Sequence, residues 1–223
     1  MQREIFITRD GSHSISIPEM KVMYHSIHGA LQESVHVFIN AGLHYIKEKF
    51  PDQSMHILEI GFGTGLNALL TIQECLFSST PVFYTSLEPY PLEIEKTSLL
   101  NYPGLLKSPE LQEYFDQLHN SEWEKEISIL SNFTLHKKKI SLQNFSSSPQ
   151  FQVIYFDAFA PTAQAELWTT EMFEKLYQAL LPGGILVTYC SKSIVRRAME
   201  AAGFKVTKPQ GPWGKREMLR AIK

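Results

Sequence analysis

The feature that most constrains this chain is an apolar segment, residues 58–65, that ends in three alternating glycines, Gly61, Gly63 and Gly65. Alternating glycines let the backbone bend sharply and approach a ligand without Cβ clashes. The apolar residues that follow predict a helix whose first N–H groups face the turn. A strand, turn and helix of this kind are typical of a nucleoside-binding site, although a tight crossover without a ligand has the same signature.

The N-terminal part of the chain is predicted to form a β-hairpin and then a helix. Residues 4–8 and 14–17 alternate apolar and polar side chains around the turn residues Asp10 and Gly11. Apolar residues recur at helical spacing over residues 31–50, and the helix is expected to end at Pro51 and Asp52.

The rest of the chain alternates short apolar segments with helical stretches, which predicts a parallel sheet with crossover helices. The predicted strands are residues 56–60, 82–87, 133–136, 153–156 and 185–189. Residues 88–133 are expected to form two helices that cap one end of the sheet. A chain of 223 residues with 43% hydrophobic content can bury one substantial core. We expect residues 51–223 to form the main domain, with residues 1–50 as an extension packed on it.

The C-terminal segment decides between classes of α/β fold. After a predicted helix at residues 193–202, a short loop joins predicted strands at residues 204–207 and 217–222. Such a short loop requires an antiparallel hairpin. A parallel sheet with an antiparallel last strand differs from the usual dinucleotide-binding arrangement. It matches class I S-adenosylmethionine-dependent methyltransferases, so the predicted fold is that Rossmann-like α/β sheet with an N-terminal hairpin and helix extension.

Two acids end the first and second predicted strands. The spacing around Glu59 is not the G-x-G-x-x-G of a dinucleotide site. Its carboxylate suits the positive amine of S-adenosylmethionine and would repel a pyrophosphate; otherwise Glu59 is a capping or solvated acid. Glu88 follows Gly65 by 23 residues, close to the roughly 20 expected for a ribose-binding carboxylate. Pro89 would stop the strand so that Glu88 faces the crevice, although Glu88 could also be an ordinary turn acid.

The segment after the fourth predicted strand holds the expected reacting centre. Asp157 lies at the carboxyl end of that strand, where ligands bind in doubly wound sheets. An amine that attacks a sulfonium methyl group must first be neutral and aligned with the S–CH₃ bond. Asp157 can orient such an amine and accept its proton, while Phe159 packs against the base or the cofactor. The alternative is an Asp157 that caps its own loop.

The formal net charge of −2 removes the general electrostatic argument for nucleic-acid binding and leaves only local basic patches. The run at residues 137–139 is one candidate, although a solvated face fits it equally. The other candidate residues are Lys192, Arg196, Arg197, Lys208, Lys215, Arg216 and Arg220.

Several other classes of site are not expected. Cys75 and Cys190 lie far apart in apolar contexts and are predicted to be reduced core thiols. The histidines at positions 25, 28, 36 and 44 lack metal-ligand spacing, so no metal site is predicted. The N-terminus lacks a secretory apolar region, and no apolar run approaches the roughly 20 residues that span a bilayer. We therefore expect a cytoplasmic protein without membrane contact.

Three segments together resemble one protein family: residues 59–65, 156–161 and 211–218. The family is the bacterial tRNA 5-methylaminomethyl-2-thiouridine methyltransferase family, of the MnmC methyltransferase-domain or stand-alone MnmD type. The similarity extends to its N-terminal signature and to its segment after the fifth strand, at residues 24–30, 33–38 and 191–197.

The resemblance implies a specific reaction. An S-adenosylmethionine-dependent enzyme of this family methylates the amine of 5-aminomethyl(-2-thio)uridine at the tRNA wobble position, with Asp157 in the acidic position near that amine. Fused members carry an oxidase domain that prepares the amine. This sequence is too short to include one, so a separate enzyme is expected to supply the precursor. At the adenine end, Ser141 stands where related sequences often have an acid, so adenine recognition is expected to involve a backbone group.

The sequence thus gives two sets of candidate site residues. The predicted cofactor-binding residues are Glu59, Gly61, Phe62, Gly63, Thr64, Gly65, Asn67, Glu88, Pro89, Ser141, Asp157 and Phe159. The predicted substrate-binding residues are Phe159, Lys192, Arg196, Arg197, Lys215 and Arg216, the basic ones facing phosphates of the anticodon loop. The flipped wobble base is expected to stack on Phe159, Trp168 or Trp213, unless the two tryptophans pack in the core.

Three other functions are compatible with the sequence. One is a methyl- or aminopropyl-transferase that acts on a small free amine. Another is a nicotinamide-binding oxidoreductase, which Glu59 and the terminal hairpin oppose. The last is a noncatalytic RNA-binding module.

Overall fold

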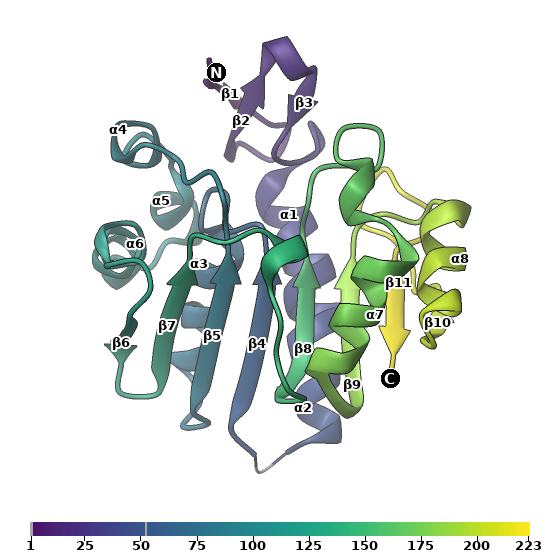
Figure 1. Cartoon of the computed structure of the whole chain (residues 1–223). Helices are drawn as coiled ribbons and strands as arrows, with labels where there is room; N and C mark the ends of the chain where they lie inside the picture. The colour runs from purple at the N-terminus through teal and green to yellow at the C-terminus, as the bar shows by residue number, and fades with distance from the viewer. Residues whose placement is uncertain (1, 52) are drawn as a thin grey trace.

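The computed structural model describes residues 2–51 and 53–223, and a twisted mixed sheet forms its centre (Figure 1). The strands of this sheet are β4 (Met55–Ile60), β5 (Val82–Leu87), β6 (Glu126–Leu130), β7 (Phe133–Lys138), β8 (Phe151–Phe156), β9 (Leu180–Thr188), β10 (Lys205–Thr207) and β11 (Leu219–Ile222). They are ordered β10-β11-β9-β8-β4-β5-β7-β6. The five strands from β9 to β7 are parallel, whereas β11 is antiparallel to both β9 and β10. The predicted fold class, including the antiparallel last strand, is confirmed.

Helices cover both faces of this sheet. The α-helices are α1 (Ala30–Ser34), α2 (Tyr45–Lys49), α3 (Leu66–Cys75), α4 (Ile94–Thr97), α5 (Tyr102–Leu106), α6 (Glu110–Asn120), α7 (Thr170–Ala179) and α8 (Ser193–Ala201). Three short 3₁₀ turns, η1 (Pro18–Met20), η3 (Leu142–Asn144) and η4 (Ala165–Leu167), connect other elements. In Figure 1, α1, α2 and α3 lie behind the sheet and α7 lies in front of it.

Side chains of alternate strand residues fill two apolar clusters, one on each face. On β8, Val153 and Tyr155 join the cluster under α3, whereas Ile154 and Phe156 join the cluster under α7 and α8. This division follows from the period of two along a strand, and burial on both faces explains why the parallel strands are almost continuously apolar. The free thiols of Cys75 and Cys190 are buried, as predicted.

The N-terminal segment forms the predicted hairpin and helix, with two additions. Strands β1 (Glu4–Ile7) and β2 (His13–Ile17) pair antiparallel, and a third strand, β3 (Val22–Met23), joins β2. A π-helical stretch, η2 (Val35–His44), connects α1 to α2 without a break. The predicted helix therefore spans nearly its expected range, although Asp52, part of its expected end, lies outside the described residues.

Glycine at position 42 lets η2 lie directly on the sheet. A Cβ at Gly42 would approach within 3.1 Å of Val187 and 3.2 Å of Tyr155. A larger residue would push the helix away from the strands, so the contact of η2 with β8 and β9 depends on this glycine.

The prediction of two helices for residues 88–133 was wrong. Three helices, α4, α5 and α6, occupy this segment, followed by the edge strand β6, which pairs antiparallel with β7. Proline at positions 103 and 109 divides the helical stretch. Strand β6 has only five residues and buries one face, so its apolar signal is weak.

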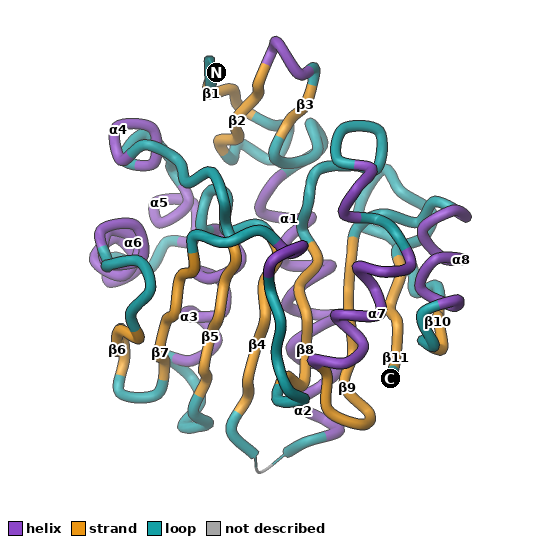
Figure 2. Tube along the Cα trace, in the orientation of Figure 1, coloured by secondary structure: helices purple, strands orange, loops and turns teal. Residues whose placement is uncertain are grey.

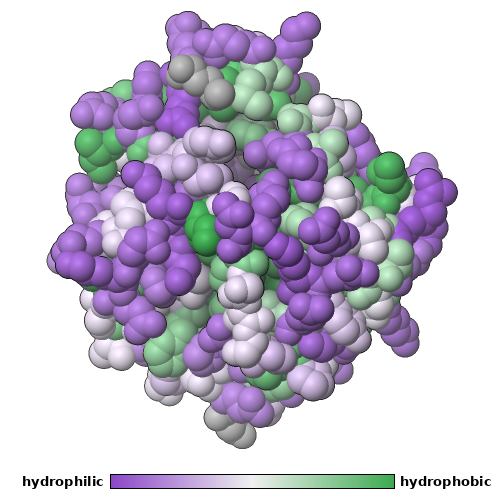
Figure 3. All heavy atoms as spheres, viewed as in Figure 1, coloured by the Kyte–Doolittle hydropathy of each residue, from purple (hydrophilic) through white to green (hydrophobic). Residues whose placement is uncertain are grey.

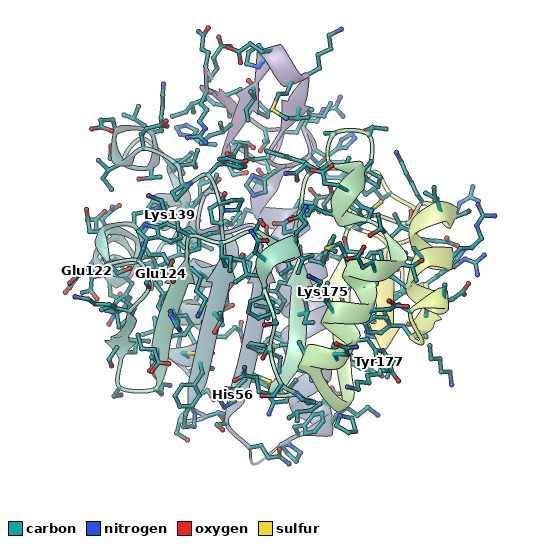
Figure 4. All side chains as sticks on the ribbon, in the orientation of Figure 1. His56, Glu122, Glu124, Lys139, Lys175 and Tyr177 are labelled. Carbon is teal, nitrogen blue, oxygen red and sulfur yellow. The ribbon has the colours of Figure 1, made fainter. Side chains whose placement is uncertain are left out.

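The lysine run at residues 137–139 is not a shared basic patch. Lys137 is 1% exposed, and its Nζ donates to the backbone oxygens of Leu118 (2.6 Å) and His119 (3.1 Å) at the C-terminal end of α6. Lys139 is exposed, and its backbone N–H donates to the Glu124 carboxylate (2.6 Å); Figure 4 labels both residues. Lys137 therefore belongs neither to a basic patch for nucleic acid nor to a solvated charged face. Side chains alternate between the two faces of β7, so Lys137 points inward and caps the C-terminal end of α6.

Loops gather at the carboxyl ends of the parallel strands, beneath the three-stranded N-terminal sheet (Figure 2). In Figure 3, hydrophilic side chains cover most of the face seen in Figure 1, and the apolar areas between them are small. Within residues 2–51 and 53–223, no helix is both long enough and apolar enough to cross a bilayer. The same residues hold no group of three or more potential metal ligands.

Candidate active site at the carboxyl ends of the strands

A cavity of about 510 Å³ opens where β4, β5 and β8 end. Its floor is the glycine-rich loop after β4, and the segments after β5, β7 and β8 form its walls. Residues of the N-terminal hairpin lie opposite the floor. The cavity therefore occupies the crevice in which doubly wound sheets bind their ligands.

The three glycines of the floor adopt conformations that other residues avoid. Their φ angles are 92° at Gly61, 50° at Gly63 and 73° at Gly65. A Cβ at Gly61 would lie 3.0 Å from the backbone oxygen of Asp157, and one at Gly63 would lie 3.2 Å from Tyr24. Helix α3 begins directly after this loop, so its free N–H groups are directed at the cavity.

Glu59 lies behind the cavity wall and does not line it. The residue is fully buried, and its carboxylate accepts hydrogen bonds from Ser86 Oγ (2.7 Å) and Asn67 Nδ2 (3.2 Å). Desolvation raises the pKa of Glu59 to about 8. The sequence predicted that Glu59 meets the donor amine directly or through water; in this structure Glu59 does not line the cavity and is joined to it through Asn67.

Glu88 lines the cavity at the end of β5, as its sequence position predicted. Its Oε2 accepts from the Gly63 N–H (3.2 Å), and its Oε1 accepts from the Tyr90 N–H (2.8 Å). Burial raises the pKa of this carboxyl. Because each carboxylate oxygen can accept more than one hydrogen bond, Glu88 retains acceptor capacity for two ribose hydroxyls.

Asp157 follows β8 and faces the same cavity. Its Oδ2 accepts a hydrogen bond of 2.9 Å from Asn67 Nδ2, the group that also contacts Glu59. Desolvation raises the pKa of Asp157 to about 7, and the Asn67 hydrogen bond opposes that shift only in part. A carboxyl with this pKa can gain or lose a proton near neutral pH, as a general base must.

The profile of the S-adenosyl-L-methionine-dependent methyltransferase family matches residues 109–223, more than half of the chain. The chain belongs to this family. The donor that the family uses is S-adenosyl-L-methionine.

Curated relatives are similar over nearly the whole chain. A "tRNA 5-methylaminomethyl-2-thiouridine biosynthesis bifunctional protein MnmC" of Nitrosospira multiformis is 30% identical over 214 residues, 89% of this chain and 33% of the relative. The protein of the same name from Leptospira interrogans is 31% identical over 205 residues, 88% of this chain and 32% of the relative. The chain therefore spans about a third of the length of these relatives.

Solved structures share the fold. MNMC2 from Aquifex aeolicus superimposes with a TM-score of 0.80 at 22% identity, covering 99% of this chain and 69% of that chain. Spermidine synthase from Thermotoga maritima does so with a TM-score of 0.58 at 17% identity, covering 99% and 68%. Both likenesses support the sheet topology described above.

The residues of the cavity fit a sulfonium donor with a free amino-acid end. Asn67 brings two carboxyls, Glu59 and Asp157, to the start of α3. Its own Oδ1 is buried and has no hydrogen-bond partner among the described residues. An ammonium group carries three N–H donors and a positive charge, which such a cluster of acceptors accommodates.

Most of the predicted donor-site residues line one cavity. Ten of the twelve line it, namely Gly61, Phe62, Gly63, Thr64, Asn67, Glu88, Pro89, Ser141, Asp157 and Phe159. Glu59 lies behind the wall, and Gly65 lies at the start of α3 just outside the lining. Ser141 precedes the turn η3 on the wall opposite α3, where it remains the candidate for adenine contact.

The aromatic residues proposed for base stacking have different positions. Phe159 lines the cavity and meets the edge of Tyr24, with ring centroids 5.0 Å apart. Trp168 is 5% exposed, donates from Nε1 to the Phe159 backbone oxygen (2.8 Å) and packs edge-on against Phe156. Trp168 therefore packs in the core, as the alternative to base stacking held, whereas Trp213 is 70% exposed.

The basic residues predicted to face anticodon phosphates differ in their surroundings: some are paired with acidic side chains and others are not. Lys215 turns inward: its Nζ is paired with the buried carboxylate of Glu33 and lies 4.3 Å from the Tyr189 ring centroid. Arg196 is paired with Glu200 one turn along α8 (2.7 Å). Both residues already have acidic partners, which weakens the prediction that they face phosphates.

The other basic residues named as candidates for phosphate contact also differ in their surroundings. Lys208 pairs with Glu217 (3.0 Å), and the guanidinium of Arg220 lies over the Tyr45 ring at 3.5 Å. Lys192, Arg197 and Arg216 are exposed, as is Lys208 despite its ion pair.

Several residues that line the cavity were not predicted. Arg3, Tyr24 and His25 come from the N-terminal segment, and Tyr90 follows β5. Tyr24 and His25 lie in a segment that carried the family resemblance, which is the signal that could have indicated them. Arg3 carries no such signal, because only the pairing of distant segments brings it to the site.

Proposed function

We propose that this methyltransferase transfers the methyl group of S-adenosylmethionine to the amine of 5-aminomethyl(-2-thio)uridine at the wobble position of tRNA. The curated relatives bear the name of 5-methylaminomethyl-2-thiouridine biosynthesis and match about nine tenths of the chain. In this proposal a separate enzyme supplies the aminomethyl precursor. The reaction takes place in the cytoplasm on the anticodon loop.

The observation that carries the proposal is the Asp157 carboxyl at the cavity. It is held by Asn67 next to the glycine-rich floor, and its pKa is about 7. A primary amine is protonated at neutral pH and cannot attack a methyl group until it loses a proton. A carboxyl of this pKa, placed where the acceptor meets the donor, supports an amine acceptor.

The chain's own residues supply positioning and proton transfer. Glu88 and the glycine loop would hold the nucleoside part of the donor, and the Oδ1 of Asn67, which has no partner among the described residues, would accept from its amino group. When bound, the sulfonium donor supplies an electrophilic methyl group. Asp157 accepts a proton from the acceptor ammonium, the freed lone pair forms the N–CH₃ bond, and the S–CH₃ electrons remain on sulfur as a neutral thioether. Phe159 and Tyr24 enclose the acceptor side and exclude water.

Mass spectrometry of wobble nucleosides tests the proposal. Purified protein and labelled S-adenosylmethionine are incubated with tRNA that carries the unmethylated aminomethyl group, and the digested nucleosides are analysed. We expect labelled 5-methylaminomethyluridine species from the wild type, a strongly reduced yield from Asp157→Asn, and a normal yield from Asp116→Asn, a matched change on the exposed face of α6. Transfer to free polyamines without any transfer to tRNA would refute the proposal in favour of a small-amine transferase.

A further inference from the structure

Arg3, in the N-terminal hairpin, makes an unusual set of long-range contacts. Its Nη1 donates to the Pro91 backbone oxygen (3.1 Å) and to Glu93 Oε2 (2.9 Å), and its Nη2 donates to the Tyr90 backbone oxygen (3.0 Å). These partners follow the ribose-site strand β5 and lie nearly 90 residues away along the chain. The Arg3 side chain is only 10% exposed. One guanidinium therefore fastens the hairpin to the loop that carries Glu88.

The hairpin also lines the donor cavity from above. Arg3, Ile17, Met20 and Tyr24 all line it, opposite the glycine-rich floor. The Tyr24 ring lies against Gly63. A donor molecule in the cavity is therefore enclosed between the floor after β4 and this N-terminal sheet, which Figure 1 shows over the strand ends.

A second set of contacts anchors the turn of the hairpin. The Asn101 side chain accepts from the His13 N–H (2.8 Å) and donates to the Gly11 backbone oxygen (2.9 Å). His13 Nδ1 lies 2.8 Å from the Leu99 backbone oxygen. These contacts lie outside the cavity lining, as do those of Asp10 and Ser12 with the first turn of α1, so they hold the turn of the hairpin in place when the Arg3 contacts break. The contacts of Asn101 and His13 can therefore act as a hinge, and the contacts of Arg3 as the latch that closes the hairpin over the cavity.

Contacts on either side of Tyr90 connect the latch to the ribose acid. The Tyr90 N–H donates to Glu88 Oε1, and the Tyr90 backbone oxygen accepts from Arg3. Glu88 Oε2 in turn accepts from the Gly63 N–H of the floor. Roof, wall and floor of the cavity are thus joined by one chain of hydrogen bonds. The Arg3 Nε is buried and has no hydrogen-bond partner among the described residues.

We propose that the N-terminal hairpin is the roof of the donor cavity, and that Arg3 is the positioning residue that latches it over the bound donor and its product. Donor entry and product release then require these contacts to open. This inference concerns the donor alone and does not depend on which amine accepts the methyl group.

Release of S-adenosylhomocysteine from the purified full chain tests the latch. Stopped-flow displacement gives its dissociation rate, and calorimetry gives its Kd. In Arg3→Ala we expect the dissociation rate to rise about tenfold, the scale of one charge-assisted hydrogen bond, with a corresponding rise in Kd. Donor KM should rise, whereas kcat at saturating donor should fall by no more than about twofold, because Arg3 does not contact the reacting atoms.

Arg9→Ala is the matched control, because Arg9 lies on the same hairpin, is exposed, and has only a 3.5 Å side-chain contact with His28. We expect it to leave the dissociation rate unchanged. Glu93→Gln removes one charged partner of Arg3 without altering the hairpin and should accelerate release by a smaller factor. An unchanged dissociation rate in Arg3→Ala, or equal acceleration by Arg9→Ala, would overturn the proposal, since the second result would mean general loosening of the hairpin.

Discussion

The raised pKa of Asp157 makes the pH dependence of methyl transfer a direct test of its role as a base. Burial opposes the charged form and moves the pKa from 3.8 to about 7. At pH 6 a carboxyl of pKa about 7 is only about one tenth ionised, whereas an ordinary aspartate is almost fully ionised. Only the ionised form can accept the ammonium proton. We therefore expect kcat/KM to fall about tenfold for each pH unit below 7.

The measurement is the initial rate of label transfer from S-adenosylmethionine to hypomodified tRNA between pH 5.0 and 8.0 at constant ionic strength. Asp157→Asn keeps the size of the side chain and removes the base. The kcat/KM of the variant should be about 10²- to 10⁴-fold lower than that of the wild type. Its kcat/KM should also not show the decrease below pH 7. Its Kd for S-adenosylhomocysteine, measured in parallel, separates loss of the base from loss of donor binding.

Two results would refute this reasoning. One is a wild-type profile that stays flat from pH 5 to 7, which would mean that the essential group has an ordinary carboxyl pKa. The other is an Asp157→Asn variant that keeps rates within about tenfold of the wild type, because a general base contributes at least about 10².

Four further substitutions test separate parts of the structure. The pKa of Glu59 is raised from 4.5 to about 8, so its contribution to stability is lost as pH rises through that range; Glu59→Gln should raise Tm at pH 8 and leave it nearly unchanged at pH 4.5 in calorimetry. His119→Phe removes the Nε2 hydrogen bond to the Thr64 backbone oxygen and should raise the Kd for S-adenosylhomocysteine about fivefold, with partial recovery in His119→Gln. Gly63→Ala forces a residue with a Cβ to φ 50° and should weaken donor binding by roughly 1–2 kcal/mol in calorimetry. Trp213→Ala should leave Tm and donor Kd unchanged but weaken tRNA binding, in a filter-binding assay, by roughly 1–3 kcal/mol.

Local patterns were sufficient to predict most of the residues that line the cavity. The glycine spacing predicted the floor of the cavity, and the ends of the predicted strands indicated Glu59, Glu88 and Asp157. Position along a strand did not show which of these side chains line the cavity and which are buried behind it. Glu59 alternates with Leu58 and Ile60, which join the cluster under α7, so its carboxylate points to the opposite face, toward Asn67 and Ser86.

Residues that depend on pairing between distant segments could not be predicted in the same way. Arg3 reaches the cavity because the hairpin folds back over the loop after β5. Lys137 is buried because the last turn of α6 ends beside β7. In both cases the partners include backbone oxygens, which carry no sequence signature. Lys215 likewise resembled a surface cation until its pairing with Glu33 placed it inward.

The order of strands has a consequence for how the chain folds during synthesis. Strand β11 lies between β9 and β10, although it is the last strand along the chain. Until residues 219–222 leave the ribosome, β9 exposes a bare edge of backbone N–H and C=O groups, and β10 has no neighbour. That half of the sheet can therefore close only after translation of β11. Shortened chains that stop before β11 would present β9 as a template for aggregation.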